Sequence, residues 1–382
     1  MRVTHIMPAL DTAGAEKMLL RLLANGDASR FEYAVISLTE PGEIGDSIAS
    51  LGIPVKALGM KRGVPDPRGI LWLARWLRST RPDVVQTWMY HADLVGGLAA
   101  RLAGGIPVAW CIRQTNLDPA VNRRIIMLSA RLCARLSRRI PAAIVCCSEA
   151  TAASHRAFGY SADRMLVLPN GYDLIEYAPD EEARVSVRQE LGVPPDALLI
   201  GLMARFHPQK DHSNFLRAAA IVASSTPQAA FVLCGHQVTA GNKDLAAWIA
   251  DTGLTGRVRL LGHRLDMPRI AASLDVAVSS SQGEGFPNAI AEAMCCGVPC
   301  VVTDVGGSAE LVGDTGTVVP ARDAAALAAG INAMLIKGAS WRRQQGLAAR
   351  ARVEARFSIT SVAARYESLY ADLATRRKPS GV

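Results

Sequence analysis

The sequence predicts two α/β domains, each built on a parallel sheet with helices on both faces. Short apolar runs alternate with amphipathic stretches, which is typical of buried strands joined by helical crossovers. The pattern begins again near residue 198, after a cluster of Pro, Gly and Asn within 169–180 that marks the joint. A chain of 382 residues is long enough for two domains of about 150–200 residues each. We therefore predict two doubly wound domains.

The apolar runs predict the strands and the amphipathic runs predict the helices. In the first half the strands are expected at 2–7, 33–38, 83–88, 107–112, 142–147 and 165–171, with helices at 14–25, 68–79 and 92–103. Ser148 is expected to begin a further helix, with Glu149 in its first turn. In the second half the strands are expected at 198–204, 229–235, 258–262, 276–281 and 299–304, with helices at 211–224 and 288–296.

Composition excludes several classes of protein. A net charge of +8 with 20% charged residues is too small to mark a nucleic-acid binder, and it fits an anionic substrate or surface. The first residues, MRVTHIMPALDTAG, do not resemble a signal peptide, and no apolar run approaches the ~20 residues that span a bilayer. The eight cysteines show no metal-ligand spacing. We expect buried thiols in a reducing cytoplasm.

The residues that follow the strands of the second half are the first candidates for a site, because parallel sheets bind ligands at the carboxyl ends of their strands. Arg205 and Lys210 stand five residues apart after the strand 198–204, just before Asp211 can cap a helix. A guanidinium fork and an ammonium together suit a diphosphate. A solvated basic loop is the alternative.

The stretch EGFPNAIAE follows the strand 276–281 and leads into a helix. Pro287 suits the first helical position and Gly297 suits the residue after the helix. The N–H groups of the first turn form a ready anion site. Glu284 and Glu292, eight residues apart, are suited to paired hydroxyls such as those of a ribose. Equally open is a helix-dipole role for Glu284 and a surface position for Glu292.

Two small-residue turns also favour phosphate. Gly306 and Gly307 precede a helix, and Gly14 follows the first strand; a backbone without Cβ atoms can approach a phosphate closely, although an ordinary turn is the alternative. The chain contains no GxGxxG, GxxxxGK[ST] or GxSxG motif and no DxD pair. We therefore expect no cofactor and no metal, so that protein cations and helix ends neutralise any bound diphosphate.

Several segments together resemble the retaining GT-B glycosyltransferases of family 4. They are AGAEKMLLRL, LPNGYD, GLMARFHPQKDH, LLGHR, SSSQGEGFPNAIAEAMCCGVPCVVTDVGGSAELV and RFSITSVAARYESLY. The resemblance covers nearly the whole chain and is most specific over 198–320. It implies an N-terminal Rossmann-like acceptor domain over 1–172, completed by a C-terminal helix at 358–382. A Rossmann-like domain over 173–357 would bind the nucleotide-sugar.

The resemblance also implies roles for individual residues. Glu292 would bind the ribose hydroxyls and Glu284 the transferred sugar, while Arg205 and Lys210 would hold the diphosphate. Backbone groups of Phe286, Pro287 and Asn288 would border the phosphates and the sugar. We also count Gly285, Gly306 and Gly307 among the expected substrate-binding residues. Arg264 would lie near the base, and Gly14 would approach the phosphates from the other domain.

The sequence departs from the family pattern in the first half. Ala13 and Gly14 stand where many members have two glycines, and Arg113 stands where many have a histidine. Arg113 can still contact donor phosphate or acceptor. His91, after the strand 83–88, is placed to meet an acceptor, although a capping or packing role is the common one for such a histidine.

Residues Arg123–Arg139 are rich in arginine and contain no acidic residue. They predict an amphipathic helix with two open interpretations: peripheral contact with anionic lipid at the inner face of the membrane, or a domain helix with a solvated arginine face.

The sequence thus predicts a metal-independent, retaining glycosyltransferase. It would move a sugar from a nucleotide-sugar to a glycan or lipid-linked acceptor in cell-surface polysaccharide or glycolipid synthesis. The alternatives are an inactive nucleotide-sugar-binding protein and another GT-B enzyme such as an epimerase.

Overall fold

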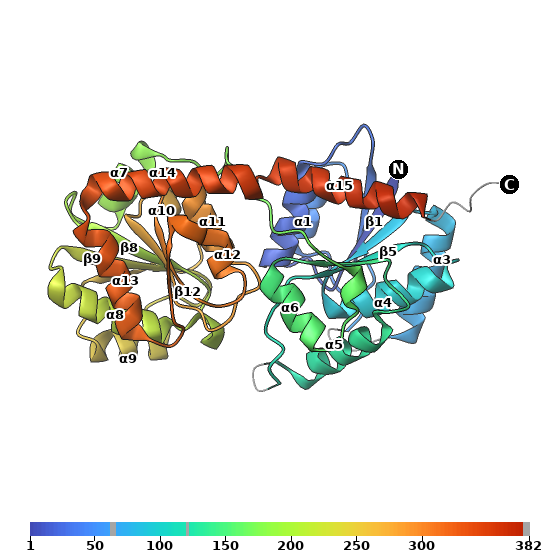
Figure 1. The fold of residues 1–382 in the computed structure, drawn as a ribbon, viewed down its shortest axis with the longest axis horizontal. Helices are drawn as coiled ribbons and strands as arrows, with labels where there is room; N and C mark the ends of the chain where they lie inside the picture. Colours follow the sequence, from blue (N-terminus) through green and yellow to red (C-terminus); the bar gives the residue numbers. More distant parts are fainter. Residues whose placement is uncertain (62–65, 120–121, 377–382) are drawn as a thin grey trace. The chain divides into compact units, whose positions relative to one another are not determined.

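The computed structural model describes residues 1–61, 66–119 and 122–376, and it divides into two compact units. The first unit comprises Met1–Gly171 and the chain from Ile359 onward, and the second comprises Tyr172–Ser358. Tyr172, which we assigned to the first domain, is therefore grouped with the second. Each unit is an α/β layer structure with helices on both faces of a parallel sheet, as the sequence predicts (Figure 1).

The first unit contains a seven-stranded sheet in the order β3-β2-β1-β4-β5-β6-β7. Its strands are β1 (Arg2–Met7), β2 (Glu32–Ser37), β3 (Val55–Ala57), β4 (Val84–Thr87), β5 (Val108–Ile112), β6 (Ala143–Cys146) and β7 (Met165–Val167). Its helices are α1 (Gly14–Ala24), α2 (Gly42–Ser50), α3 (Pro67–Thr80), α4 (Met89–Leu102), α5 (Arg124–Leu136), α6 (Glu149–Ala157), the short η1 (Ala162–Arg164) and α15 (Ile359–Thr375).

The second unit contains a six-stranded sheet in the order β10-β9-β8-β11-β12-β13. Its strands are β8 (Leu198–Met203), β9 (Ala229–Cys234), β10 (Val258–Leu260), β11 (Val276–Ser279), β12 (Cys300–Thr303) and β13 (Thr317–Val319). Its helices are α7 (Glu181–Glu190), η2 (Pro208–Lys210), α8 (His212–Ser225), α9 (Lys243–Asp251), α10 (Met267–Ala272), α11 (Asn288–Cys295), α12 (Ser308–Val312), η3 (Gly313–Thr315), α13 (Ala324–Ile336) and α14 (Gly338–Phe357).

Burial on both faces of the sheet explains why the central strands could be predicted from the sequence. Every residue of β5 and of β12 is buried, so these strands appear in the sequence as unbroken apolar runs. The edge strands β3 and β13 were not predicted, because each has only three residues and neither is a buried apolar run: two residues of β3 are exposed, and only Val319 of β13 is buried. All eight cysteines are buried free thiols, as predicted.

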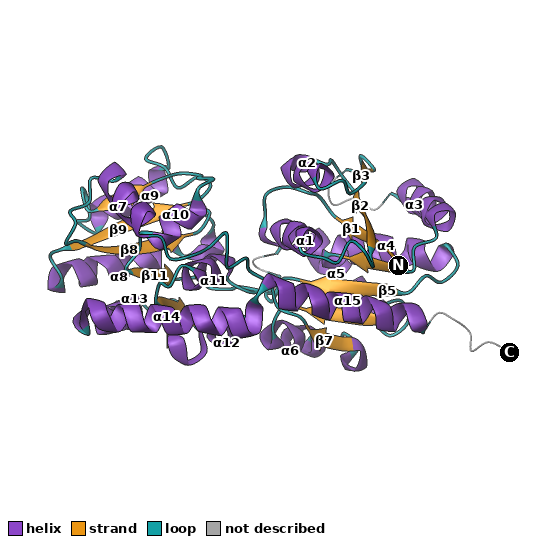
Figure 2. Ribbon diagram, turned by 90° about the horizontal axis from the view of Figure 1, so that it is seen from above, coloured by secondary structure: helices purple, strands orange, loops and turns teal. Residues whose placement is uncertain are grey.

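The last helix, α15, packs into the first unit, where it lies along the sheet (Figure 2). Val362, Tyr366, Tyr370 and Leu373 enter the same core as residues of β1, α1 and β2. Glu367 accepts a hydrogen bond from the backbone N–H of Asp27 at 2.6 Å, which fixes the helix to the loop after α1. The expected helix at 358–382 ends at Thr375, and residues 377–382 lie outside the described part of the chain.

Helix α5 has one buried face and one arginine face. Met127, Ala130, Cys133 and Ala134 are buried against the first unit, which is the domain-helix arrangement that we left open. Its outward residues include Arg124, Arg131 and Arg135, and all three are exposed. Within the described residues, no helix combines the length and apolar character needed to cross a bilayer.

Candidate active site

The strand order of the second unit creates the place where a ligand is expected. From β8 the chain proceeds outward to β9 and β10, and from β11 it proceeds in the opposite direction to β12 and β13. Strands β8 and β11 are direct neighbours, so the sheet changes direction between them. Ligands of open parallel sheets bind beside such a switch point, at the carboxyl ends of the strands. The loops 204–211, 280–287 and 304–307 follow the carboxyl ends of β8, β11 and β12.

Lys210 and Glu284 meet across this switch point. The Nζ atom of Lys210 lies 2.5 Å from Oε1 of Glu284, and their side chains are 24% and 10% exposed. The hydroxyl of Ser281 donates a second hydrogen bond to the same carboxylate oxygen at 2.6 Å. Two donors therefore hold one oxygen of the carboxylate, while the ammonium keeps donors for a ligand, because it has three. Two residues that lie 74 positions apart in the chain thus share one site.

The loop that carries Lys210 is fixed by its neighbours. Asp211 adopts φ +49° and caps α8 by accepting a hydrogen bond from the N–H of Asn214, as its position predicted. The hydroxyl of Ser280 donates to the carbonyls of Lys210 and Asp211, and the side-chain amide of Gln282 donates to Asp211 at 2.7 Å. Hydrogen bonds therefore join the loops after β8 and β11, so the position of Lys210 depends on both loops.

The two glycines after β12 approach the Glu284 loop at very short range. Gly306 adopts φ +55°, and a Cβ atom built on it would lie 1.8 Å from the carbonyl oxygen of Glu284. The N–H of Gly307 donates to the carbonyl of Gly285 at 3.1 Å. The glycine at 306 is therefore required by close backbone packing inside the protein. Contact of these glycines with a phosphate stays a prediction.

Helix α11 begins directly after this loop. Pro287 is the N-cap and Asn288 the first helical residue, so our placement of Pro287 at the first helical position was wrong by one residue. The hydroxyl of Tyr172 donates to Oδ1 of Asn288 at 2.8 Å, and Phe286 stacks on the Tyr172 ring with centroids 6.5 Å apart. Glu292, in the second turn of α11, is buried with 8% exposure, which excludes a position on the surface.

Arg205 and Arg264 have different surroundings. Arg205 is exposed, and no ion pair to it occurs within the described part of the chain. Partial burial lowers the pKa of the nearby His207, and the positive charges of Arg205 and Lys210 lower it further. Arg264 instead pairs with Glu190 at 2.5 Å and with Asp266 at 2.7 Å. These hydrogen bonds raise the pKa of Arg264 and lower the pKa of Asp266 to about 2. If Arg264 contacts the base of the nucleotide, it would use the guanidinium N–H groups that Glu190 and Asp266 do not occupy.

The first unit has its own switch point, between β1 and β4, and two predicted residues follow these strands. Gly14 is the first residue of α1, so its N–H belongs to the free helix end. His91 lies in α4, and its Nδ1 atom is 3.2 Å from the hydroxyl of Ser129 in α5. This contact is of the packing kind that we named as the alternative, and a role for His91 toward an acceptor stays a prediction.

Arg113 follows β5 and is held by neutral groups. Its guanidinium donates to Oδ1 of Asn170 at 2.7 Å and to the hydroxyl of Tyr366, and it lies over the ring of Trp88 at 5.2 Å. Because Tyr366 belongs to α15, Arg113 links the carboxyl end of β5 to the last helix. Contact of Arg113 with donor or acceptor stays a prediction.

Sequence reasoning missed Ser281 and Tyr172. Ser281 hydrogen-bonds Glu284, and the serine run before QGEG was a usable signal, because hydroxyls that follow a buried strand face the same edge as the carboxylate. Tyr172 reaches Asn288 from 116 residues away, and such a contact has no local signature.

Comparison with known proteins agrees with this arrangement. The family model for glycosyl transferases group 1 matches residues 197–337, and the model for glycosyltransferase family 4 matches residues 12–176. The chain belongs to the group 1, family 4 glycosyltransferases. The first match contains Arg205, Lys210, Glu284 and Glu292, so these candidate residues lie within the stretch that the group 1 model matches.

Individual relatives extend the comparison over most of this glycosyltransferase. EpsF of Bacillus subtilis strain 168, which its name assigns provisionally to the glycosyltransferases, is 28% identical over 79% of each chain. An Escherichia coli enzyme is 26% identical over 70% of this chain and 69% of its own; its name is UDP-Gal:α-D-GlcNAc-diphosphoundecaprenol α-1,3-galactosyltransferase. The crystal structure of Anabaena Alr3699/HepE in complex with UDP superposes with a TM-score of 0.85. It covers 97% of this chain and all of that one at 23% identity. This likeness shows the GT-B fold.

Proposed function

We propose that this glycosyltransferase transfers a sugar from a nucleotide-sugar to a hydroxyl of a glycan or lipid-linked acceptor, with retention of the anomeric configuration. The product would enter a cell-surface polysaccharide or glycolipid. The contact between Lys210 and Glu284 carries the proposal, because it unites a cation for phosphate with a carboxylate for sugar hydroxyls at the switch point. The first turn of α11 follows directly and favours negative charge.

In this proposal the donor lies along the edge of the second unit, from α11 to the loop after β8. Glu292 accepts hydrogen bonds from the ribose hydroxyls and Glu284 from hydroxyls of the transferred sugar. Lys210 and Arg205 bind the diphosphate; backbone N–H groups of 285–288 and of Gly306 and Gly307 border it. Because Lys210 already contacts Glu284, a bound donor would place its sugar and its phosphate on the two sides of one ion pair.

The reaction would break the bond between the anomeric carbon and the phosphate oxygen. That oxygen takes the electron pair, and the charge that develops on the diphosphate is stabilised by Lys210, Arg205 and the start of α11. The acceptor hydroxyl attacks the same face of the oxocarbenium-like carbon and transfers its proton to the departing phosphate. We propose this route because Glu284, the carboxylate that we place beside the transferred sugar, is already engaged by Lys210 and Ser281.

We further propose that transfer requires no metal ion. The two cations and the helix end supply positive charge where a metal would otherwise be needed. Unchanged activity in EDTA would support this view, and a complete loss of activity that a divalent ion reverses would contradict it.

The names of similar proteins support the choice of substrates to test first. Solved structures of Anabaena Alr3699/HepE contain UDP and UDP-glucose, and the E. coli relative takes UDP-Gal and a diphosphoundecaprenol-linked sugar by its name. We therefore propose a uridine diphosphate sugar as the donor and a diphosphate-linked lipid sugar as the acceptor class.

A donor screen followed by a turnover assay tests the proposal. UDP-, GDP- and ADP-sugars are compared by thermal shift, since a ligand stabilises the fold that binds it. The donor that binds is then supplied with diphosphate-linked lipid acceptors, and the anomeric configuration of the product is read by NMR. Binding without nucleotide release for any acceptor would favour the inactive binding protein. Conversion of the donor sugar without transfer would favour the epimerase, and an inverted product would refute retention.

We also propose peripheral contact of α5 with the anionic cytoplasmic face of the membrane. Arg124, Leu128, Arg131 and Arg135 are all exposed and recur at helical spacing, and α5 contains no acidic residue. Each cation near an anionic surface contributes about 1 kcal/mol. Replacement of Arg131 and Arg135 by Gln should therefore weaken partitioning onto phosphatidylglycerol vesicles about 30-fold. Equal flotation of this variant and the wild type would refute the contact.

A further inference from the structure

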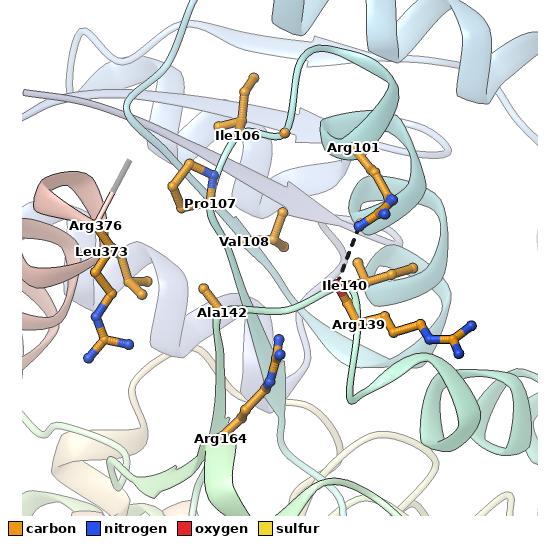
Figure 3. A pocket seen from close by; sticks show the side chains of 12 residues that line it. Arg101, Ile106, Pro107, Val108, Arg139, Ile140, Ala142, Arg164, Leu373 and Arg376 are labelled. Atoms are coloured by element: carbon orange, nitrogen blue, oxygen red, sulfur yellow. Dashed lines mark hydrogen bonds between the residues drawn. The ribbon is translucent and has the colours of Figure 1, made fainter. Parts of the chain in front are cut away.

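A second basic site lies in the first unit, at the amino-terminal ends of its strands. Gly14, His91 and Arg113 instead follow the carboxyl ends of strands. A depression of about 300 Å³ opens beside the residues that begin β5 and that precede β6 and β7. Four arginines line it: Arg101, Arg139, Arg164 and Arg376. In Figure 3 the side chains of Arg101 and Arg164 point toward the segment from Ile140 to Ala142, that of Arg139 extends outward from it, and Arg376 lies across Ala142. A larger depression of about 960 Å³ adjoins it and shares Ala142, Arg164 and Arg376. We call the two together the arginine pocket.

The four arginines come from four separate segments of the chain. Arg101 lies in α4, Arg139 follows α5, Arg164 ends η1 and Arg376 follows α15. Segments this far apart in sequence converge here only through the fold. The convergence is therefore a property of the first unit and cannot be attributed to one charged helix.

The guanidinium groups of the pocket keep most of their donors for a ligand. Arg101 donates to the carbonyl of Arg139 at 3.4 Å, and Arg164 donates to the carbonyl of Pro141. A guanidinium has five N–H donors, so each retains several. Among the described residues no carboxylate forms an ion pair with Arg101, Arg139, Arg164 or Arg376, although the exposed Asp163 lines the larger depression.

The floor of the pocket increases the effect of these charges. Ile106, Pro107, Val108 and Ala142 line it together with the arginines. Apolar walls lower the local dielectric constant, so the like charges repel one another more strongly than they would in water. Arg138 adds a further positive charge at the rim of the larger depression. An anion that enters the pocket removes this repulsion and accepts the available hydrogen bonds.

We propose that the arginine pocket binds a phosphate-bearing group. A phosphate offers three or four oxygens that can accept from several guanidinium forks at once, and guanidinium matches phosphate in bidentate geometry. Both a free phosphate and a phospholipid headgroup have this chemistry. The site is separate from the donor site of the second unit, and the proposal does not depend on the proposed function.

The test compares phosphate binding by variants of the pocket with binding by two matched controls. In Arg101→Gln/Arg164→Gln two guanidinium groups are removed. In Arg376→Glu the charge is reversed, and the backbone hydrogen bonds of Arg101 and Arg164 are kept. Arg75→Gln removes an exposed arginine of α3 that lies outside the pocket. Lys210→Ala removes the phosphate cation of the candidate active site. Near-ultraviolet circular dichroism shows whether each variant keeps its fold.

Inorganic phosphate is titrated calorimetrically, and flotation is measured on phosphatidylcholine vesicles with and without phosphatidic acid. We expect each pocket variant to bind phosphate or phosphatidic acid vesicles about tenfold or more weakly than the wild type does. The controls Arg75→Gln and Lys210→Ala should bind these probes at the arginine pocket as the wild type does. If the pocket variants lose binding of phosphate alone, the ligand is a free anion. If they lose binding of vesicles alone, the ligand is a lipid headgroup. Undiminished binding by folded Arg376→Glu, or no binding of either probe by the wild type, overturns the proposal. Glycosyl transfer by the pocket variants, measured separately, keeps this outcome distinct from failure of the proposed function.

Discussion

Replacing Gly306 by alanine tests whether backbone packing positions the carboxylate of the candidate site. Gly306 has φ +55°, and its Cα faces the carbonyl of Glu284, where an added Cβ would lie at 1.8 Å. Gly192, in the same unit, provides the matched control. It has φ +60°, and a Cβ there would meet nothing within 4 Å. The two substitutions therefore share the backbone cost and differ in the contact.

The structure sets the expected magnitudes. A left-handed backbone costs a residue with a Cβ about 1–2 kcal/mol, so both variants should lose about that much stability. In Gly306→Ala the contact must also open from 1.8 Å to the ordinary 3.4 Å, a displacement of about 1.6 Å. The displaced segment carries Glu284. A misplacement of about 1 Å at a reacting centre costs on the order of 100-fold in rate.

Initial rates of sugar transfer and thermal unfolding measure the two effects separately. We expect Gly306→Ala to lose about 100-fold in kcat at a temperature where it stays folded, and Gly192→Ala to transfer sugar at nearly the wild-type rate. If folded Gly306→Ala matches Gly192→Ala in rate, the approach of the two loops does not position Glu284 and our account of this glycine is wrong.

Three further predictions concern single side chains. Lys210→Ala should lower kcat by about 100- to 1000-fold, because the leaving diphosphate loses its nearest cation, and Lys210→Arg should restore part of it; a rate within tenfold of wild type for the alanine variant would contradict this role. Glu292→Ala should weaken nucleotide binding by about tenfold or more in calorimetry, since a charged acceptor is lost, whereas unchanged affinity would remove Glu292 from the site. Burial lowers the pKa of His5 from 6.5 to about 3, so its neutral form stabilises the fold fully above pH 6.5 and this stability is lost as the pH falls toward 3. Between pH 7 and pH 5 the free energy of unfolding should fall by about 2 kcal/mol through His5, as measured by urea unfolding with tryptophan fluorescence. His5→Gln should lack this part of the decrease, and an equal decrease in both proteins would refute the assignment.

The sequence predicted the fold well where burial leaves a periodic mark. Strands such as β5 and β8 are buried on both faces. Helices α6 and α8 begin after Ser148 and Asp211, whose side chains cap them as their positions in the sequence indicate. Short edge strands have no such mark, since the three residues of β3 are largely in contact with solvent. Pairing with a neighbouring strand, which local sequence does not contain, is what makes these residues a strand.

The candidate site was predictable as a set of loops and less so as a set of contacts. The rule that ligands bind after parallel strands selected the loops of Lys210, Glu284 and Gly306. The direct pairing of Lys210 with Glu284 depends on β8 and β11 being neighbours, which follows from the strand order. Arg264 shows the limit of the rule, because one of its two carboxylate partners, Glu190, lies 74 residues away and could not be predicted from the LGHR segment.

The placement of α15 has a consequence for biosynthesis. The second unit is one continuous stretch, Tyr172–Ser358, whereas the first needs Val362, Tyr366 and Tyr370 to complete one of its cores. Domains fold as units while the chain leaves the ribosome. The first unit therefore cannot complete this core until α15 has emerged, whereas every residue of the second unit has been synthesised before α15. Nascent chains halted before α15 should accordingly recruit chaperones through their amino-terminal half.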